Sequence, residues 1–239
     1  AHGSLNLEKV AVLRDAKSDY SVGLAQYFVA EFGRLGGTVT GNESFQQGDV
    51  DFKGPLTALI NTGPQGLFVP GYYTEVGLIA RQARELGFTG PLLGGDGWDS
   101  PRLAEIGGAA VEGCYFSNHY TTQDPSPVVQ NFITRFRAKH AQDPDAMAAL
   151  GYDAARLLAQ CLSSLHQEDA ALFAALRSDH KLAGAGREER SRAQEALRSR
   201  IAATRGFEGV TGIITLDEER NAHKPAVVLQ VKNGRYEFV

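Results

Sequence analysis

Side chains able to bind a small amine gather in a few loops of the first 120 residues. The candidates are a hydroxyl, a carboxylate and four aromatic rings: Ser18, Tyr20, Tyr72, Tyr73, Asp96 and Trp98. Aromatic rings beside a desolvated carboxylate suit a ligand that has an apolar body and a cationic ammonium group. These residue types therefore predict the binding of a small solute with an apolar body and an ammonium group, with no catalytic residue among them.

The three tyrosines also have a purely structural explanation. Tyr20 can pack the helix around it as well as line a site. Tyr72 and Tyr73 are neighbours in the sequence, and neighbours on an extended segment point in opposite directions. We therefore expect one of this pair to face a cleft and the other to pack inward.

The remaining candidates are open to the same two explanations. Asp96 lies between Gly95 and Gly97, and Gly-Asp-Gly is commonly no more than a turn. Trp98 suits either a surface anchor or the wall of a cleft. His119 is expected to be a hydrogen-bonded residue at the end of a strand rather than a catalyst. Their place in the fold has to separate these roles.

An alternation of strands and helices is predicted to position these loops. The expected strands are 10–13, 38–40, 67–69, 92–93 and 114–116, and the expected helices are 22–35, 52–60, 76–86 and 101–106. The strands are apolar throughout, which is typical of a parallel sheet covered on both faces. Right-handed crossovers favour a doubly wound α/β sheet, and ligands bind beyond the carboxyl ends of its strands.

The chain is organised differently after residue 120. Two helices are predicted at 128–140 and 146–165, with no strand between them. The charged segment 166–205 is helix-prone, with a break at 184–186. Strands return near the end of the chain, at 212–216, 226–231 and 236–239. Asn233 and Gly234 join the last two, a pair of residues that indicates a β-hairpin.

The composition and the motifs exclude several classes of function. A formal net charge of -4 argues against nucleic acid or an anionic membrane as the main partner. The sequence has no phosphate-binding glycine loop, no serine-hydrolase elbow and no His-Glu-x-x-His motif. Its six histidines show no metal-ligand spacing, and Cys114 and Cys161 are expected to be free, buried thiols. We therefore predict no enzyme, cofactor or metal site.

Several motifs in combination resemble one known family. They lie at 10–13, 18–21, 68–75, 93–98, 151–155, 207–212 and 224–228. With them the chain resembles the branched-chain amino-acid (Leu/Ile/Val-type) substrate-binding proteins of ABC transporters, from residue 7 almost to its end. No single motif would carry this resemblance.

The resemblance implies a periplasmic-binding-protein type I fold, in which two lobes hold an amino acid between them. By motif, Tyr20 and Tyr72 are similar to cleft residues of the family's second lobe, and Asp96 is similar to the acid that meets the ligand's α-ammonium. It also implies an amino-acid-like ligand, the membrane subunits of an ABC transporter as partners, and a periplasmic or other extracytoplasmic location.

The chain departs from the family at its start, where the segment that builds most of the first lobe is absent. We therefore expect an α/β ligand-binding lobe over 5–120 plus 207–239, and a helical segment over 121–206. The apolar faces of helices 128–165 would lack their usual sheet. We expect them to repack on the chain itself, to pair with a second copy, or to bind another polypeptide.

Two other functions stay open at this point. An interaction or sensory module that kept the fold but lost tight ligand binding would account for the missing lobe and the long charged helical stretch. A flavodoxin-like enzyme or flavin carrier is the least favoured, because the loop after the first strand does not form a phosphate cradle.

Overall fold

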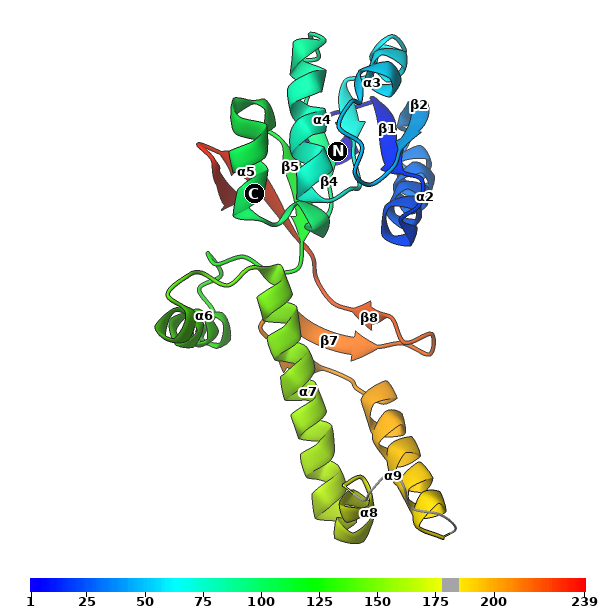
Figure 1. The fold of residues 1–239 in the computed structure, drawn as a ribbon, viewed down its shortest axis with the longest axis vertical. Coiled ribbons are helices and arrows are strands. Elements are labelled where there is room, and N and C mark those ends of the chain that lie inside the picture. Colours follow the sequence, from blue (N-terminus) through cyan, green and yellow to red (C-terminus); the bar gives the residue numbers. More distant parts are fainter. Residues whose placement is uncertain (178–184) are drawn as a thin grey trace. The chain divides into compact units, whose positions relative to one another are not determined.

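The computed structural model describes residues 1–177 and 185–239, which divide into two compact units. Unit 1 consists of Ala1–Gln123 and Ala226–Val239, and unit 2 of Asp124–Pro225. Figure 1 shows the elements of each unit.

A seven-stranded sheet forms the centre of unit 1, in the order β10-β9-β5-β4-β3-β1-β2. Its strands are β1 (Lys9–Asp15), β2 (Thr38–Phe45), β3 (Gly66–Phe68), β4 (Leu92–Gly94), β5 (Tyr115–Asn118), β9 (Val227–Lys232) and β10 (Arg235–Phe238). Strands β1 to β5 are parallel, whereas β9 and β10 add an antiparallel edge. The predicted doubly wound parallel sheet with a C-terminal hairpin is confirmed.

Strand β1 shows why this sheet must be covered on both faces. Val10 and Val12 belong to one buried cluster, while Ala11 and Leu13 belong to the other. Successive side chains on a strand point to opposite faces, so an unbroken apolar run buries both of them. Each such valine or leucine stabilises the fold by about 1.5–3 kcal/mol on burial.

Helices cover the two faces unequally. The helices of unit 1 are α1 (His2–Leu5), α2 (Asp19–Arg34), α3 (Lys53–Ile60), α4 (Tyr73–Glu85) and α5 (Pro101–Gly107), with 3-10 turns η1 (Asp96–Trp98) and η2 (Gly108–Val111). Residues of α3, α4 and α5 join the larger buried cluster, and residues of α2 join the smaller one. The sheet therefore lies between two helical layers, as its apolar strands require.

Several boundaries in unit 1 differ from those expected, and two of the differences have a clear physical reason. Strand β2 extends to Phe45 rather than ending at residue 40, because it is an edge strand and tolerates polar residues on its open side. Helix α2 begins at Asp19 rather than at residue 22, since the Ser18 side chain accepts a hydrogen bond from the Ser21 amide and caps it. That earlier start places Tyr20 in the first turn of α2.

The C-terminal hairpin forms as its Asn-Gly pair predicts. Asn233 and Gly234 both have positive φ angles, of 52° and 68°. Positive φ at both central residues is the requirement of a type I′ turn, whose twist matches that of the flanking strands. Strands β9 and β10 pair antiparallel on either side of it.

Unit 2 combines helices with a small antiparallel sheet. Its elements are α6 (Pro127–His140), α7 (Ala146–Glu168), α8 (Ala170–Ala175), α9 (Ala185–Ala202), β6 (Phe207–Gly209), β7 (Gly212–Leu216) and β8 (Ala222–His223). Helices α7 and α9 run side by side, and α8 lies at the end of α7 (Figure 1). Of the break expected at 184–186, residue 184 lies outside the described residues, and Ala185 and Gly186 belong to α9.

A buried carboxylate binds the small sheet of unit 2 to helix α7. Asp153 is 2% exposed and accepts hydrogen bonds from the Val210 amide at 2.7 Å and from the Thr211 amide and hydroxyl at 2.8 and 2.9 Å. A Cβ on Gly209 would lie 2.5 Å from its Oδ2 atom, so this position needs glycine. Strands β6 and β7 belong to unit 2, and residues 226–239 of the predicted 207–239 segment belong to unit 1.

Candidate ligand-binding site

Asp96 lies at the carboxyl end of β4, where the chain turns into η1. Its Oδ1 accepts a hydrogen bond from the Tyr20 hydroxyl at 2.8 Å, and its Oδ2 lies 3.1 Å from Nε2 of His119. The Tyr20 hydroxyl in turn accepts a hydrogen bond from the Gly97 amide at 2.9 Å. The parallel sheet thus brings the ends of β4 and β5 and the start of α2 together at one edge.

Tyr72 extends this site with an exposed aromatic face. Its ring stacks on that of Tyr20, with centroids 5.2 Å apart and planes at 25°. Tyr72 is 43% exposed and occupies the extended residue before α4. Tyr73 instead packs against the larger buried cluster, with the Arg102 guanidinium 6.0 Å from its ring centre. Only the first tyrosine of the pair therefore lies at the site.

The glycines around Asp96 are required by close packing. A Cβ on Gly95 would lie 2.8 Å from the Tyr20 hydroxyl, and a Cβ on Gly97 would lie 2.7 Å from the Gly71 carbonyl oxygen. Real Cβ atoms do not approach that closely, so side chains here would displace the aromatic rings. The Gly-Asp-Gly sequence is therefore more than a turn, because it lets Tyr20 and Tyr72 close on the backbone.

Trp98 is a core residue, which corrects the expectation that it is a surface anchor or a cleft wall. Its side chain is fully buried within the larger cluster, and its indole N–H donates to the Val69 carbonyl at 3.0 Å. A Cβ on Gly94 would lie 2.1 Å from the indole ring, so the ring can pack against the backbone there only because residue 94 is glycine. A ligand at the site cannot touch Trp98.

Serines at the start of α2 position Tyr20. The Ser18 hydroxyl accepts from the Ser21 amide at 3.3 Å, a helix-capping contact that accounts for its place beside the site. The Ser21 hydroxyl, which sequence analysis did not single out, donates to the Pro70 carbonyl and accepts from the Asp15 amide at 2.9 Å. It joins the ends of β1 and β3 to α2. The Ser-x-x-Ser spacing of Ser18 and Ser21 at the start of α2 is the sequence pattern that could have identified Ser21.

The electrostatics of the site favour a bound cation. Burial raises the pKa of Asp96, but hydrogen bonds to His119 and Tyr20 outweigh burial and hold that pKa below its usual value. Burial and the Asp96 charge raise the pKa of Tyr20, so its hydroxyl stays protonated. Asp96 is therefore a carboxylate at neutral pH with a neutral donor beside it. Such a low pKa suits charge pairing rather than general base catalysis.

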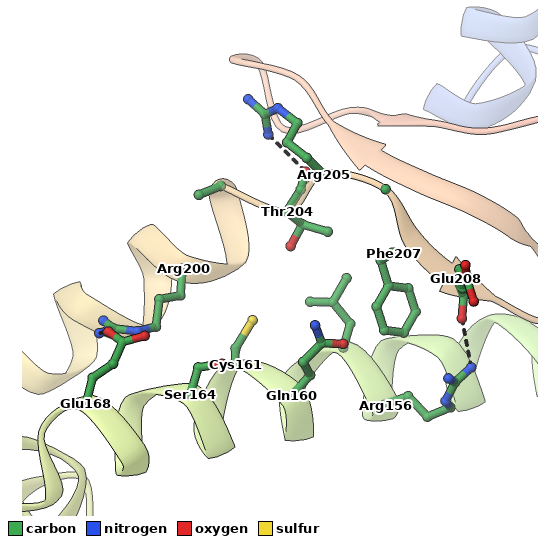
Figure 2. Close-up of a pocket in the computed structure, with 13 residues that line it drawn as sticks. Arg156, Gln160, Cys161, Ser164, Glu168, Arg200, Thr204, Arg205, Phe207 and Glu208 are labelled. Atoms are coloured by element: carbon green, nitrogen blue, oxygen red, sulfur yellow. Dashed lines mark hydrogen bonds and ion pairs between the residues drawn. The ribbon is translucent and has the colours of Figure 1, made fainter.

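A separate hollow of about 600 Å³ lies in unit 2, among α7, α9 and β6 (Figure 2). Its arginines are already engaged by the protein. Arg156 donates to the Glu208 carbonyl at 3.0 Å, Arg200 pairs with Glu168, and Arg205 donates to the Thr204 carbonyl at 2.9 Å. The one aromatic ring among the described residues that line the hollow, Phe207, is only 7% exposed, whereas the Tyr72 ring beside Asp96 is 43% exposed. Asp96 is the better candidate.

The two thiols are buried, and the possible metal ligands of the described residues are scattered. Cys114 and Cys161 are both free and buried, as predicted, and burial raises the pKa of each thiol. In residues 1–177 and 185–239, no three His, Cys, Asp or Glu side chains are grouped as metal ligands would be. Across those same ranges, every helix is too short or too polar to span a bilayer.

The fold is a doubly wound α/β sheet, a class of fold in which ligands bind beyond the carboxyl ends of the parallel strands. The sequence matches the family described as "Periplasmic binding protein" over residues 3–235. That match covers nearly the whole chain. The chain therefore belongs to the periplasmic binding protein family, as its motifs suggested.

Curated relatives narrow the resemblance to one branch of this family. The chain is 33% identical over 133 residues to "Leu/Ile/Val-binding protein homolog 3" of Brucella melitensis, covering 56% of this chain and 36% of that protein. It is 30% identical over 162 residues to the "Leucine-, isoleucine-, valine-, threonine-, and alanine-binding protein" of Pseudomonas aeruginosa, covering 67% and 42%. The chain thus spans less than half the length of these relatives.

Solved structures agree with the sequence matches. A leucine binding protein, LivK, from Thermotoga maritima superposes with a TM-score of 0.82 at 38% identity, covering 100% of this chain and 61% of that one. The branched-chain amino-acid binding protein LivJ from Streptococcus pneumoniae, solved with isoleucine, gives 0.75 at 29% identity, covering 100% and 62%. Both relatives are longer than this chain.

Proposed function

We propose that this chain binds a branched-chain or related amino acid for uptake by an ABC transporter. The single observation that carries the proposal is the Asp96 carboxylate, held by Tyr20 and His119 beside the exposed ring of Tyr72. The names of the relatives, which describe leucine, isoleucine and valine binding, support the same class of solute. The membrane subunits of the transporter would be the protein partners, and the site would work outside the cytoplasm without catalysis.

The geometry suggests how the solute is held. Its ammonium group pairs with Asp96, and its aliphatic side chain lies against the Tyr72 ring. Opposite charges about 4 Å apart attract by about 4 kcal/mol at an effective dielectric constant near 20. Solvent reduces that value here, because the Asp96 side chain is 22% exposed. Since these contacts hold the ammonium group and the aliphatic chain but not the α-carboxylate, we expect weak binding by this chain.

Ligand titration followed by NMR tests the proposal, because it detects millimolar binding. We expect leucine and 3-methylbutan-1-amine, which share an ammonium group and a branched chain, to shift the same resonances. The acid 4-methylpentanoate, which lacks the ammonium group, should not shift them. Asp96→Asn should weaken amine binding about tenfold or more, corresponding to at least 1.4 kcal/mol. Equal binding of the amine and the acid would refute the proposal.

A matched control separates the Asp96 contact from a general effect of charge. Glu85→Gln also removes one carboxylate from unit 1, at the other end of α4, where Glu85 pairs with Lys53 at the surface. We expect this variant to bind the amine as the unaltered chain does. Loss of binding in both variants would indicate a nonspecific charge effect instead of a site at Asp96.

Exposed apolar side chains in unit 2 favour a second candidate, an interaction or sensory module. Met147 and Leu158 of α7 are 55% and 41% exposed, and Ile213 of β7 is 60% exposed. We propose that helices 128–165 take part in self-association or bind another polypeptide. Sedimentation of the chain and of Leu158→Ser over a range of concentrations tests this. A monomer at every concentration, in both proteins, would exclude self-association.

A further inference from the structure

We propose that His119 controls the charge of the Asp96 site, so that acidification releases the bound amine. This inference rests on the proposed function and adds a pH-dependent regulation to it. Its basis is that Nε2 of His119 lies 3.1 Å from Oδ2 of Asp96, the oxygen that Tyr20 does not use. The imidazole thus contacts the same carboxylate that would attract a cationic ligand.

The two charge states of the imidazole have opposite effects on a cation. A neutral imidazole can donate its Nε2–H to Asp96 and leave the full negative charge of the carboxylate for the ligand. A protonated imidazolium forms an ion pair with Asp96 and repels an ammonium group nearby. His119 is one-third exposed, so solvent weakens this repulsion without removing it. We expect protonation of His119 to weaken amine binding about tenfold or more.

The backbone holds His119 at Asp96. His119 follows the last residue of β5, and its amide donates to the side-chain Oδ1 of Asn118 at 2.8 Å. Asn118 is 3% exposed, so this contact is fixed within the protein. The imidazole therefore lies beside the carboxylate because β4 and β5 are neighbours in the sheet.

Asp96 and Tyr20 keep their charge states between about pH 5.5 and 8, the range in which imidazoles titrate. Tyr20 faces Asp96 from α2, Tyr72 stacks on Tyr20 from the residue before α4, and Asp99 ends η1. The pKa of Asp96 itself is lowered and that of Tyr20 is raised, which moves both further from this range.

The test measures binding of 3-methylbutan-1-amine at pH 8 and pH 5.5 by NMR titration of the 239-residue chain. An alkylammonium group titrates near pH 10, like that of lysine, so the probe stays cationic throughout. We expect the dissociation constant of the unaltered chain to rise about tenfold or more on acidification. His119→Gln keeps a neutral N–H donor for Asp96 but cannot ionise, so its dissociation constant should change less than about twofold.

Controls make each outcome decisive. His2→Gln removes a histidine of unit 1 that contacts Phe32, away from Asp96, and should keep the full pH dependence. Circular dichroism at both pH values shows whether each variant is folded. If the amine binds at pH 8 but His119→Gln keeps the pH dependence, or the unaltered chain shows none, this inference is wrong and the proposed function stands. If the amine binds no protein at either pH, the proposed function fails and this inference with it.

Discussion

Replacing Asp153 by asparagine should destabilise unit 2 much more than a single isosteric change usually does. The carboxylate is 2% exposed and accepts three hydrogen bonds, from the Val210 amide and from the amide and hydroxyl of Thr211. An asparagine amide NH₂ cannot accept, so when its oxygen takes the place of Oδ1, the two Thr211 donors lose their acceptor. This leaves buried donors unpaired at the turn between β6 and β7.

The magnitude follows from the number and kind of bonds lost. A hydrogen bond to a charged group contributes about 1.5–3 kcal/mol, and an unsatisfied buried donor costs about 1–3 kcal/mol. Two donors are affected, and the loss of the charge weakens the third bond. Since such contributions are not additive, we expect about 3–5 kcal/mol of destabilisation in total.

Urea unfolding followed by far-UV circular dichroism measures this effect, with a matched control on the same helix. Asp145 is exposed and caps α7 by accepting from the Ala148 amide at 2.8 Å. Asparagine caps helices about as well as aspartate, so Asp145→Asn should change stability by less than about 0.5 kcal/mol. Equal unfolding midpoints for Asp153→Asn and Asp145→Asn would refute the account of the buried carboxylate.

Three further predictions concern unit 1. Gly97→Ala should weaken amine binding and lower the stability measured by thermal unfolding by about 1–3 kcal/mol, because its Cβ would lie 2.7 Å from a backbone oxygen. The control Gly23→Ala adds its methyl group in open space within α2 and should stabilise the protein by about 0.5–1 kcal/mol. Trp98→Phe should lower the unfolding midpoint, since the buried indole hydrogen bond is lost, yet leave amine affinity unchanged in the NMR titration. The pKa of Asp96 is lower in the folded state, so its contribution to stability is present above about pH 4 and is lost as pH falls further. In urea unfolding, the stability difference between the unaltered chain and Asp96→Asn should accordingly be largest near neutral pH and shrink as the pH falls below about 4.

Local patterns predicted most of the elements of unit 1. Apolar runs such as 10–13 indicated buried parallel strands, because residues of β1 pack on both faces of the sheet. The Asn233-Gly234 pair indicated the hairpin, since both residues adopt positive φ. Such features depend on neighbours in the sequence, so they are visible without coordinates. The tyrosines and the carboxylate of the candidate site could be identified in the same way, because they follow directly after strands that the sequence predicts.

Only the tertiary structure decided which candidate residues meet. Trp98 and Asp96 lie two residues apart, yet one is buried in the core and the other reaches Tyr20 and His119. The contact of Asp153 with the β6–β7 turn likewise joins residues 57 and 58 positions apart. Periodicity records which side of an element is apolar, but not which distant element covers it. The amino-acid sequence thus determined the sheet and the edge at which its loops gather, whereas the packing of glycines, rings and strands decided the partners of Asp96.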